Sequence, residues 1–599
     1  MATYRTFGWV QNPSDFKKLK KTVQVFDPSS EHYQQLQKHI ISDVIYFAED
    51  KNHFQDQLDN RVCEFSYRDL VGTSINKDGK SPKKRSESVA NSLLQVSILP
   101  QSAKTKGKMY TDNWTADGFL RWAVSLNFVS HNRDTDTFKI TSFGKNFSSS
   151  VDDSSEELTI LREAMLSYPP ASRVMSLLAE SNKPMTKFAI GSQLGFVGEK
   201  GFTSYDEDLM IDWLKSTSDT KELTKIRTDV EGTSDKYARM ICGWLSKLKY
   251  VTKKSTKYIN ATGNPITGFQ QYALTGEGLH AIKQANGSSK NKIHPKFVMW
   301  EFFATENSSD SGQTREFVRT RRAYTLKGLE HYHTLDTLLE SLKDHGIFEE
   351  RETLLADLYK LVSFGIRISI TKNSVKLLDT INDFSIPNQT FTLDEAAAKS
   401  EEIKNHFRRI TELPERYLEL LDIAFDPKHN RDFEIITAGL FKEVYGLEAI
   451  HLGGGNKPDG VIYNDNFGII LDTKAYAKGY GMHTGQIDEM VRYIEDNRFR
   501  DAVRNPNKWW ENFAADIPSD QYYYLWVSGK FLKSFDKQLK KTNYRTKING
   551  GGLEVQQLLL GANAVQQHKL DVNTIPSYMK NEVITFVENW PTFVMARTT

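Results

Sequence analysis

Residues 457–474 read Lys457-Pro458-Asp459-Gly460-Val461-Ile462-Tyr463-Asn464-Asp465-Asn466-Phe467-Gly468-Ile469-Ile470-Leu471-Asp472-Thr473-Lys474. Two apolar runs of strand length flank a polar turn, which predicts a β-hairpin. Asp459 stands just before the first strand, Asp472 closes the second, and Lys474 follows two residues later. Because residues i and i+2 of a strand share one face, we expect Asp472 and Lys474 to point the same way. The hairpin should bring Asp459 back beside them.

Two neighbouring carboxylates can hold a hard divalent cation, and a lysine can position or deprotonate a water molecule. Such a set of groups can hydrolyse a phosphodiester. The order Pro-Asp, strand, Asp-Thr-Lys matches the signature of the PD-(D/E)xK nucleases. A Pro-Asp-Gly turn followed by a strand that ends in Asp is also a common structural hairpin. The pattern alone therefore leaves both interpretations open.

The composition of the chain is that of a globular protein, with 39% hydrophobic, 12% aromatic and 26% charged residues among 599. This length predicts three to five domains. No apolar run is long enough to span a membrane, and residues 1–6 lack the apolar core of a signal peptide. Cys63 and Cys242, the only cysteines, are too few for a disulfide framework or a structural zinc site, which fits a reducing cytoplasm. With a formal net charge of +2, any contact with nucleic acid must come from local clusters of cations.

Basic clusters surround a predicted helix in the first unit, residues 1–155. The clusters are residues 17–21, 77–85 and 104–108, the last with Lys104, Lys106 and Lys108. The helix begins near Asp112-Asn113-Trp114, and a strand is predicted at 138–141. Helices followed by a short β-wing would make a winged-helix module, a variant of helix-turn-helix. A solvated surface is the more usual meaning of such clusters.

The same pattern recurs in the second unit, residues 156–296. A helix is predicted at 234–245, with Ser234 or Asp235 as N-cap and wing strands at 250–252, 258–259 and 272–275. Its apolar stripe consists of Tyr237, Ile241, Trp244 and Leu248. Lys236 and Arg239 lie off the stripe near the start, where a recognition helix presents side chains to base edges. A solvated basic face on a core helix is the alternative.

A third helical unit with a short strand is predicted at 297–384. Its basic stretch, Arg315 with residues 319–322, fits a DNA face or an interdomain salt-bridge surface, and we favour the second. A linker is predicted at 385–395, where Ile386-Pro387-Asn388-Gln389 breaks the chain, and a charged helix should follow. In residues 396–599 helices and strands alternate around the opening hairpin, which predicts an α/β domain.

The sequence resembles the FokI type of type IIS restriction endonuclease over nearly its full length. The matching stretches lie in the same order along both chains and include residues 5–13, 112–114, 117–123, 167–171, 234–240, 243–245, 318–323, 451–454, 457–460 and 472–476. The resemblance implies a multidomain fold. N-terminal α+β winged-helix subdomains would precede a C-terminal α/β PD-(D/E)xK domain of the restriction-endonuclease type.

The resemblance also implies an activity. Such an enzyme of the prokaryotic cytoplasm binds a short asymmetric site in double-stranded DNA, expected to be GGATG, and cuts both strands at a fixed distance outside it. It implies Asp459, Asp472 and Lys474 as the catalytic residues, with Mg²⁺ on the two aspartates. Glu434 matches an acidic position that could assist the metal, although a glutamate on a helix is more often a solvated or capping residue.

Further residues are implied to bind DNA or a second copy of the chain. The DNA-binding positions are Gln11, Asn12, Arg85, Trp114, Glu231, Lys236 and Arg239, whose side chains suit guanine, adenine and cytosine edges. Residues 228–230 depart from the family pattern, which puts part of the sequence specificity in doubt. Asp488 and Arg492 match the pair through which two cleavage domains dimerise, and an intrahelical ion pair is the alternative. A non-catalytic DNA-binding protein and a monomeric nicking enzyme remain rival functions.

Overall fold

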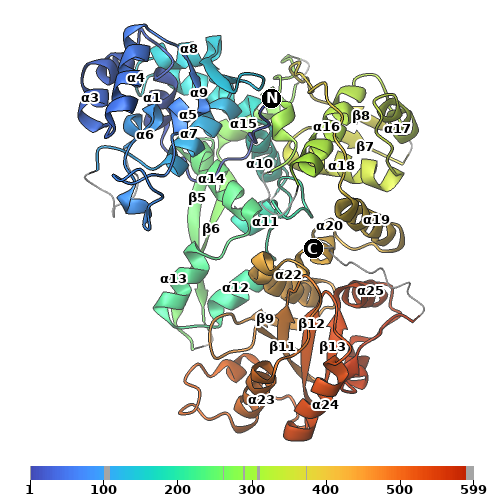
Figure 1. Cartoon of the computed structure of the whole chain (residues 1–599). Helices are drawn as coiled ribbons and strands as arrows, with labels where there is room; N and C mark the ends of the chain where they lie inside the picture. The colour runs from blue at the N-terminus through green and yellow to red at the C-terminus, as the bar shows by residue number, and fades with distance from the viewer. Residues whose placement is uncertain are drawn as a thin grey trace.

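The computed structural model describes residues 2–99, 108–181, 183–260, 262–287, 290–305, 311–372 and 374–588. Lys104 and Lys106 of the third basic cluster lie outside the described residues. Figure 1 shows the first and third units at the top of the molecule, a sheet-containing fourth unit at the bottom, and the second unit between them, extending down beside the fourth. Within the described ranges no helix has both the length and the apolar character needed to cross a membrane.

The first unit contains helices and a small antiparallel sheet. Its elements are α1 (Phe16–Gln24), α2 (Glu31–Gln35), α3 (Ile41–Val44), α4 (Ala48–Asp59), β1 (Glu64–Ser66), α5 (Tyr67–Val71), α6 (Leu93–Ser97), α7 (Asn113–Ser125), β2 (Val129–Asn132), β3 (Thr137–Ile140) and α8 (Ser142–Ser149). The strands pair in the order β1-β3-β2. Asp112 caps α7, because its carboxylate accepts the backbone N–H of Thr115 at 2.9 Å. The predicted order of helix and then β-hairpin is confirmed.

The second unit repeats this arrangement with a longer hairpin. Its elements are α9 (Ser155–Ser167), α10 (Pro169–Glu180), β4 (Met185–Thr186), α11 (Lys187–Gly191), α12 (Glu207–Lys215), α13 (Thr220–Thr228), α14 (Thr233–Lys247), β5 (Val251–Ile259), β6 (Pro265–Leu274) and α15 (Gly276–Ala285). The predicted wing strands are confirmed as strand segments, but the first two belong to one long strand, β5, which pairs with β6 in a hairpin. Most of β5 is exposed and polar, so it lacks the apolar alternation that marks a strand in sequence.

Helix α14 contains three residues of the predicted apolar stripe, the fourth, Leu248, is its C-cap, and all four are buried. Trp244 stacks on Trp122 of α7 with ring centroids 4.8 Å apart, so α7 and α14 pack against each other. The predicted N-cap is wrong: the cap is Gly232. Asp235 lies inside the first turn, where its carboxylate accepts the Gly232 N–H at 2.9 Å and the Ser204 hydroxyl at 2.5 Å.

The third unit buries Arg319, Arg321 and Arg322 of its basic stretch. It consists of α16 (Gly312–Gly328), α17 (Leu335–Lys343), α18 (Arg351–Phe364), β7 (Ile368–Ile370) and β8 (Val375–Leu377). Arg321 and Arg322 of α16 share the Asp357 carboxylate of α18 at 2.6 and 2.9 Å. Arg321 also pairs with Glu349 at 2.8 Å, and Arg322 pairs with Glu199 of the second unit. For these two arginines the structure supports the salt-bridge interpretation and leaves them no free DNA face.

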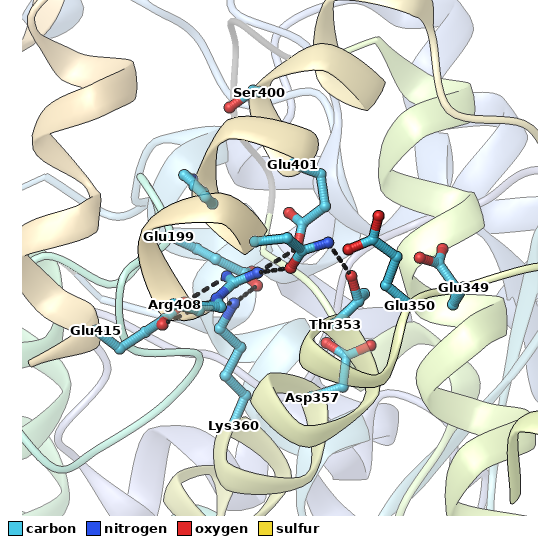
Figure 2. A network of polar contacts seen from close by, with 12 residues as sticks. Glu199, Glu349, Glu350, Thr353, Asp357, Lys360, Ser400, Glu401, Arg408 and Glu415 are labelled. Carbon is cyan, nitrogen blue, oxygen red and sulfur yellow. Dashed lines mark hydrogen bonds and ion pairs between the residues drawn. The ribbon is translucent and has the colours of Figure 1, made fainter. Parts of the chain in front are cut away.

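Figure 2 shows a network of polar contacts that joins the second and third units to α19 (Glu395–Ile410) and α20 (Glu415–Leu418). Lys360 of α18 lies 3.2 Å from Glu199 and 3.5 Å from Glu415. Arg408 of α19 donates to Glu401 at 2.7 Å and to Glu415 at 2.6 Å. The charged helix predicted after the linker is confirmed as α19, whereas the domain boundaries stay predictions. Glu199 and Glu415 each contact two cations from different elements, so these carboxylates tie the units together.

Residues 199–206, here named the connector segment, link α14 to the fourth unit. The carbonyl of Thr203 accepts the backbone N–H of Ser234, in the first turn of α14, at 2.9 Å. The hydroxyl of the same Thr203 donates to the buried carboxyl of Glu419, between α20 and α21 (Leu420–Ile423), at 2.7 Å. One residue thus contacts both α14 and the fourth unit.

The fourth unit is built on a six-stranded mixed sheet with strand order β14-β13-β12-β11-β10-β9. Its further elements are α22 (Asn430–Glu443), β9 (Glu448–His451), β10 (Gly460–Tyr463), β11 (Gly468–Lys474), α23 (Thr484–Phe499), β12 (Tyr522–Ser528), α24 (Phe535–Thr546), β13 (Gly550–Glu554), α25 (Val555–Gln566) and β14 (Glu582–Val583). Side chains of α22 and α25 pack on one face of the sheet, and those of α23 and α24 pack on the other. The predicted α/β domain is confirmed.

Candidate functional site

The hairpin predicted from residues 457–474 is formed by β10 and β11, with Gly460 opposite Leu471. This register places Asp459 and Asp472 at the same end of the hairpin. The Asp459 carboxylate accepts the backbone N–H of Thr473 at 2.7 Å and its hydroxyl at 3.1 Å. The Lys474 ammonium donates to the Asp472 carboxylate. The structure therefore brings the three predicted catalytic residues together.

Burial sets the protonation of this cluster. The Asp472 side chain is only 4% exposed. Burial and the neighbouring Asp459 raise the pKa of Asp472 well above its ordinary value, against the opposing charge of Lys474. Burial alone would lower the pKa of Lys474, but the two carboxylates outweigh it and raise that pKa. Lys474 is thus held as an ammonium between two acidic groups.

The neighbouring strand β12 supports the lysine. It runs parallel to β11, with Asp472 opposite Trp526 and Lys474 opposite Ser528. The Ser528 hydroxyl donates to the Lys474 carbonyl at 2.7 Å, and the Lys474 ammonium lies 5.2 Å from the centre of the Trp526 ring. These contacts fix both the backbone and the side chain of Lys474 on the sheet.

Glu434 is turned toward a histidine. Its carboxylate lies 3.0 Å from Nε2 of His451, a buried residue of β9 whose ring packs edge-on against Trp213 of α12, with centroids 4.4 Å apart. Among the described residues no group of three or more His, Cys, Asp or Glu is placed to hold a metal. Glu434 therefore does not share a ligand cluster with the two aspartates, and its assisting role stays a prediction.

Asp488 and Arg492 lie on α23 but do not pair with each other. Asp488 accepts a hydrogen bond from Arg545 of α24 at 2.5 Å. Arg492 lies 3.5 Å from Glu489. The alternative of an intrahelical ion pair between Asp488 and Arg492 is wrong, because each prefers another partner. Asp488, Arg492 and Arg545 all stay substantially exposed, so these groups remain accessible to a second protein.

A groove of about 670 Å³ lies between α14 and the β5–β6 hairpin. Of the residues predicted to bind DNA, Asn12 and Arg239 line it. Four further cations line it that sequence reasoning missed: Lys187, Arg227, Lys247 and Lys253. No carboxylate occurs among the described residues that line the groove. Its five cations and its position along a helix suit a nucleic-acid backbone.

Other predicted DNA-binding residues lie near the start of α7. The Trp114 side chain is 72% exposed, and Arg85 forms an ion pair with Asp112, the residue that caps α7. Gln11 hydrogen-bonds with the buried Tyr237 of α14. Lys236 is partly exposed on α14 but does not line the groove. Trp114 and Arg85 thus add an exposed surface on the first unit.

Glu231 differs from the other predicted DNA-binding residues, because its side chain is only 2% exposed. Its carboxylate accepts hydrogen bonds from Lys187 at 2.6 Å and from Arg239 at 2.7 and 3.1 Å. Burial would raise the pKa of Glu231, but the Arg239 hydrogen bond and the Lys187 charge outweigh it and hold that pKa below its usual value. In this structure Glu231 is an ionised carboxylate behind the groove.

The fourth unit has a mixed sheet with two acidic residues and a lysine at one end of a hairpin, and it is joined to helical units with a cationic groove. This combination is typical of the restriction endonucleases, which cut DNA. Family models of FokI match in four places: recognition subdomain 1 at residues 5–150, recognition subdomain 2 at 157–290, the D3 domain at 308–373 and the cleavage domain at 397–585. The chain belongs to the FokI family of type IIS restriction endonucleases.

Individual relatives cover almost the whole chain. It is 38% identical to the type II restriction enzyme FokI of Planomicrobium okeanokoites, over 97% of this chain and 99% of the relative. It is 30% identical to the type II restriction enzyme StsI of Streptococcus sanguinis, over 98% and 96%. The solved structure of FokI bound to DNA superposes with a TM-score of 0.87 at 37% identity, over 98% of this chain and 100% of that one. The structure of FokI itself gives a TM-score of 0.85 over 97% and 100%.

Proposed function

We propose that the chain recognises a short asymmetric site in double-stranded DNA, GGATG as the family resemblance implies, and hydrolyses one phosphodiester in each strand at a fixed distance outside it. The observation that carries this proposal is the juxtaposition of Asp459, Asp472 and Lys474 at one end of the hairpin. The cationic groove beside α14 supports DNA as the substrate.

The donor set fits Mg²⁺ as the cofactor. Asp459 and Asp472 offer carboxylate oxygens, and Mg²⁺ in proteins is commonly held by one or two carboxylates while waters and substrate phosphates complete its shell. When bound, Mg²⁺ would stabilise the charge that develops on the phosphate during hydrolysis. The Asp472 side chain is buried and its pKa is raised by Asp459, so a cation between the two carboxylates would relieve their repulsion.

The protein residues have separate roles in this scheme. Thr473 holds the Asp459 carboxylate in place through two hydrogen bonds. Asp472 shares the metal position with Asp459. Lys474, an ammonium in this structure, would hold the attacking water by a hydrogen bond and offset negative charge at the phosphate. Its contact with Asp472 fixes the direction in which it points.

Double-strand cleavage requires two such sites, because each Asp459–Asp472–Lys474 set acts on one strand. We assign Asp488 and Arg492 on α23 to the contact between two copies of the chain on DNA. Such a contact can be weak in free solution, since binding to one DNA molecule raises the effective concentration of the second copy. A monomeric nicking enzyme is the rival that keeps the chemistry and lacks this contact.

A plasmid assay tests the proposal. Plasmids with and without a single GGATG are incubated with the protein in Mg²⁺ and in EDTA. We expect linear product only with the site and Mg²⁺, and run-off sequencing then gives both cut positions. Asp472→Ala should abolish cutting and keep DNA binding, whereas Asp465→Ala, in the exposed turn of the same hairpin, should cut normally. Retained cutting by Asp472→Ala would refute the site, and nicked product alone would favour the monomeric enzyme.

The recognition sequence needs its own measurement. Thr228, where the family has an amide-bearing residue, ends α13 and donates its hydroxyl to the Thr224 carbonyl at 2.7 Å. A hydroxyl engaged in its own helix cannot make the paired hydrogen bonds that an amide makes with adenine. Digestion of a library with randomised sites would show whether the adenine of GGATG is still selected. Cleavage without that preference would correct the site and leave the endonuclease assignment intact.

A further inference from the structure

Lys187 and Arg239, which line the groove, form an ion-pair cluster with the buried Glu231. The side chains of Lys187 and Glu231 are 6% and 2% exposed, while that of Arg239 is 45% exposed. Oε1 of Glu231 accepts from Lys187 Nζ at 2.6 Å and from Arg239 Nε at 2.7 Å. Oε2 accepts from Nη2 of Arg239 at 3.1 Å. The carboxylate thus connects a buried lysine to a groove-lining arginine.

The pairing leaves one edge of Arg239 available. A guanidinium has five N–H donors, and Glu231 takes those of Nε and one of Nη2 along the side edge. The Nη1–Nη2 edge remains, and among the described residues its only hydrogen-bond partner is the Met240 sulfur, 3.7 Å from Nη1. Two parallel donors on one edge match the O6 and N7 acceptors of guanine. Glu231 therefore fixes the orientation in which Arg239 can read that base.

Lys187 keeps this arrangement stable when DNA is bound. A buried carboxylate that loses part of its pairing with cations raises the free energy of the folded protein. Arg239 would also bind a base, which weakens its pairing with Glu231. Lys187 is only 6% exposed and keeps its ammonium beside Glu231. Its ammonium lies 4.9 Å and 5.6 Å from the ring centres of Phe188 and Phe269, and those rings confine it beside Glu231.

We propose that Lys187 is a positioning residue for DNA recognition, which neutralises Glu231 so that Glu231 can hold Arg239 in its base-reading orientation. This proposal rests on the DNA-binding function proposed above. It separates Lys187 from the other cations of the groove, such as the exposed Lys253 of β5. Lys253 would contact phosphates directly, and Lys187 would act through Arg239.

The test compares Lys187→Met with Lys253→Met in the full-length protein. Each variant binds the cognate duplex and duplexes with single base-pair changes, at several salt concentrations. For Lys187→Met we expect discrimination at one G·C pair to fall about 10-fold, with an unchanged salt slope. For Lys253→Met we expect equal weakening on every duplex and a salt slope reduced by about 1. Lys187→Arg should restore discrimination, because it keeps the charge and the hydrogen bond.

A double-mutant cycle tests the route through Arg239. If Lys187 acts through Arg239, Lys187→Met should cost nothing further in an Arg239→Ala background. Wild-type discrimination by Lys187→Met, or full additivity with Arg239→Ala, would overturn the proposal. If Lys187→Met does not fold, Lys187→Met/Glu231→Leu removes both buried charges, and wild-type discrimination by that variant would overturn it equally. A wild-type protein with no sequence preference would instead refute the proposed function.

Discussion

The backbone N–H and the hydroxyl of Thr473 both donate to one oxygen of the Asp459 carboxylate, at 2.7 and 3.1 Å. Thr473 lies between Asp472 and Lys474 on β11. The residue between these two side chains thus orients Asp459. Asp459 lies one residue beyond the Gly460–Leu471 pair, at the end of the hairpin next to Asp472, where both the backbone N–H and the hydroxyl of Thr473 reach its carboxylate.

Thr473→Val should therefore weaken catalysis without removing a catalytic group. Valine keeps the shape of the side chain and loses the hydroxyl, so Asp459 keeps only the backbone hydrogen bond. A hydrogen bond to a charged group is worth about 1.5–3 kcal/mol, so we expect a cleavage rate lower by about 10-fold or more and a higher Mg²⁺ requirement. Steady-state plasmid cleavage across a Mg²⁺ titration measures both. Thr473→Ser, which keeps the hydroxyl, is the control, and equal rates for the two variants would contradict this role.

The ion pair between Asp488 and Arg545 allows a sharper test of the dimer. Asp488→Arg should reduce double-strand cutting and leave nicked plasmid, because it repels Arg492 of a second copy. Arg545→Ala should maintain or increase double-strand cutting, because it frees the Asp488 carboxylate. The ratio of nicked to linear product, followed over time, measures the effect. Unchanged ratios for Asp488→Arg would show that this surface is not the contact.

Glu419 should make the stability of the protein pH-dependent. Burial raises the pKa of Glu419 from 4.5 to about 8, against the Thr203 hydrogen bond, so the folded state holds a proton that the unfolded state releases. Between pH 4.5 and about 8 the folded state binds more protons, and stability therefore falls as pH rises through this window. Glu419→Gln keeps an acceptor for Thr203 and does not titrate. Its melting temperature should fall less than that of the wild type between pH 5 and 8, and parallel curves would rule out this origin.

Trp114 should contribute to DNA affinity and not to folding. Its side chain is 72% exposed at the start of α7, so Trp114→Ala removes few internal contacts. We expect an unchanged melting temperature and DNA binding weaker by about 10-fold, the scale of one good base contact. Tyr359→Ala, which removes an aromatic side chain that is 55% exposed on α18, is the matched control and should bind normally. Equal affinities for the two variants would remove Trp114 from the interface.

Local patterns in the sequence were sufficient to predict the hairpin and α14. The apolar runs beside Asn464 and Asp465 have the length and turn chemistry of two paired strands, and the stripe from Tyr237 to Leu248 repeats at helical spacing. Both patterns depend on residues close in sequence. They also predicted the geometry of the Asp459–Asp472–Lys474 cluster, because Asp459 and Asp472 belong to one hairpin.

Such local patterns do not predict which residues pair when they lie far apart in the sequence. Lys187 and Glu231 are 44 positions apart, and nothing near Lys187 in sequence indicates that its partner is a buried carboxylate. The spacing of Asp488 and Arg492, one helical turn apart, allows an intrahelical ion pair as the alternative to a dimer contact, yet Arg545 from another helix binds the Asp488 carboxylate. The choice between partners depends on how helices pack, which composition and spacing do not fix.

The connector segment has a consequence for how such enzymes change over time and how they can be rebuilt. Thr203 bonds at once to the first turn of α14 and to Glu419, and Tyr205 of the same segment donates to Asp432 of α22 at 2.6 Å. A substitution that shifts the first turn of α14 should therefore also change the contacts of Thr203 and Tyr205 with the fourth unit. A chimera that takes the residues after 395 from a relative therefore needs a compatible connector segment at 199–206. During evolution we expect the connector segment and the residues after 395 to change together.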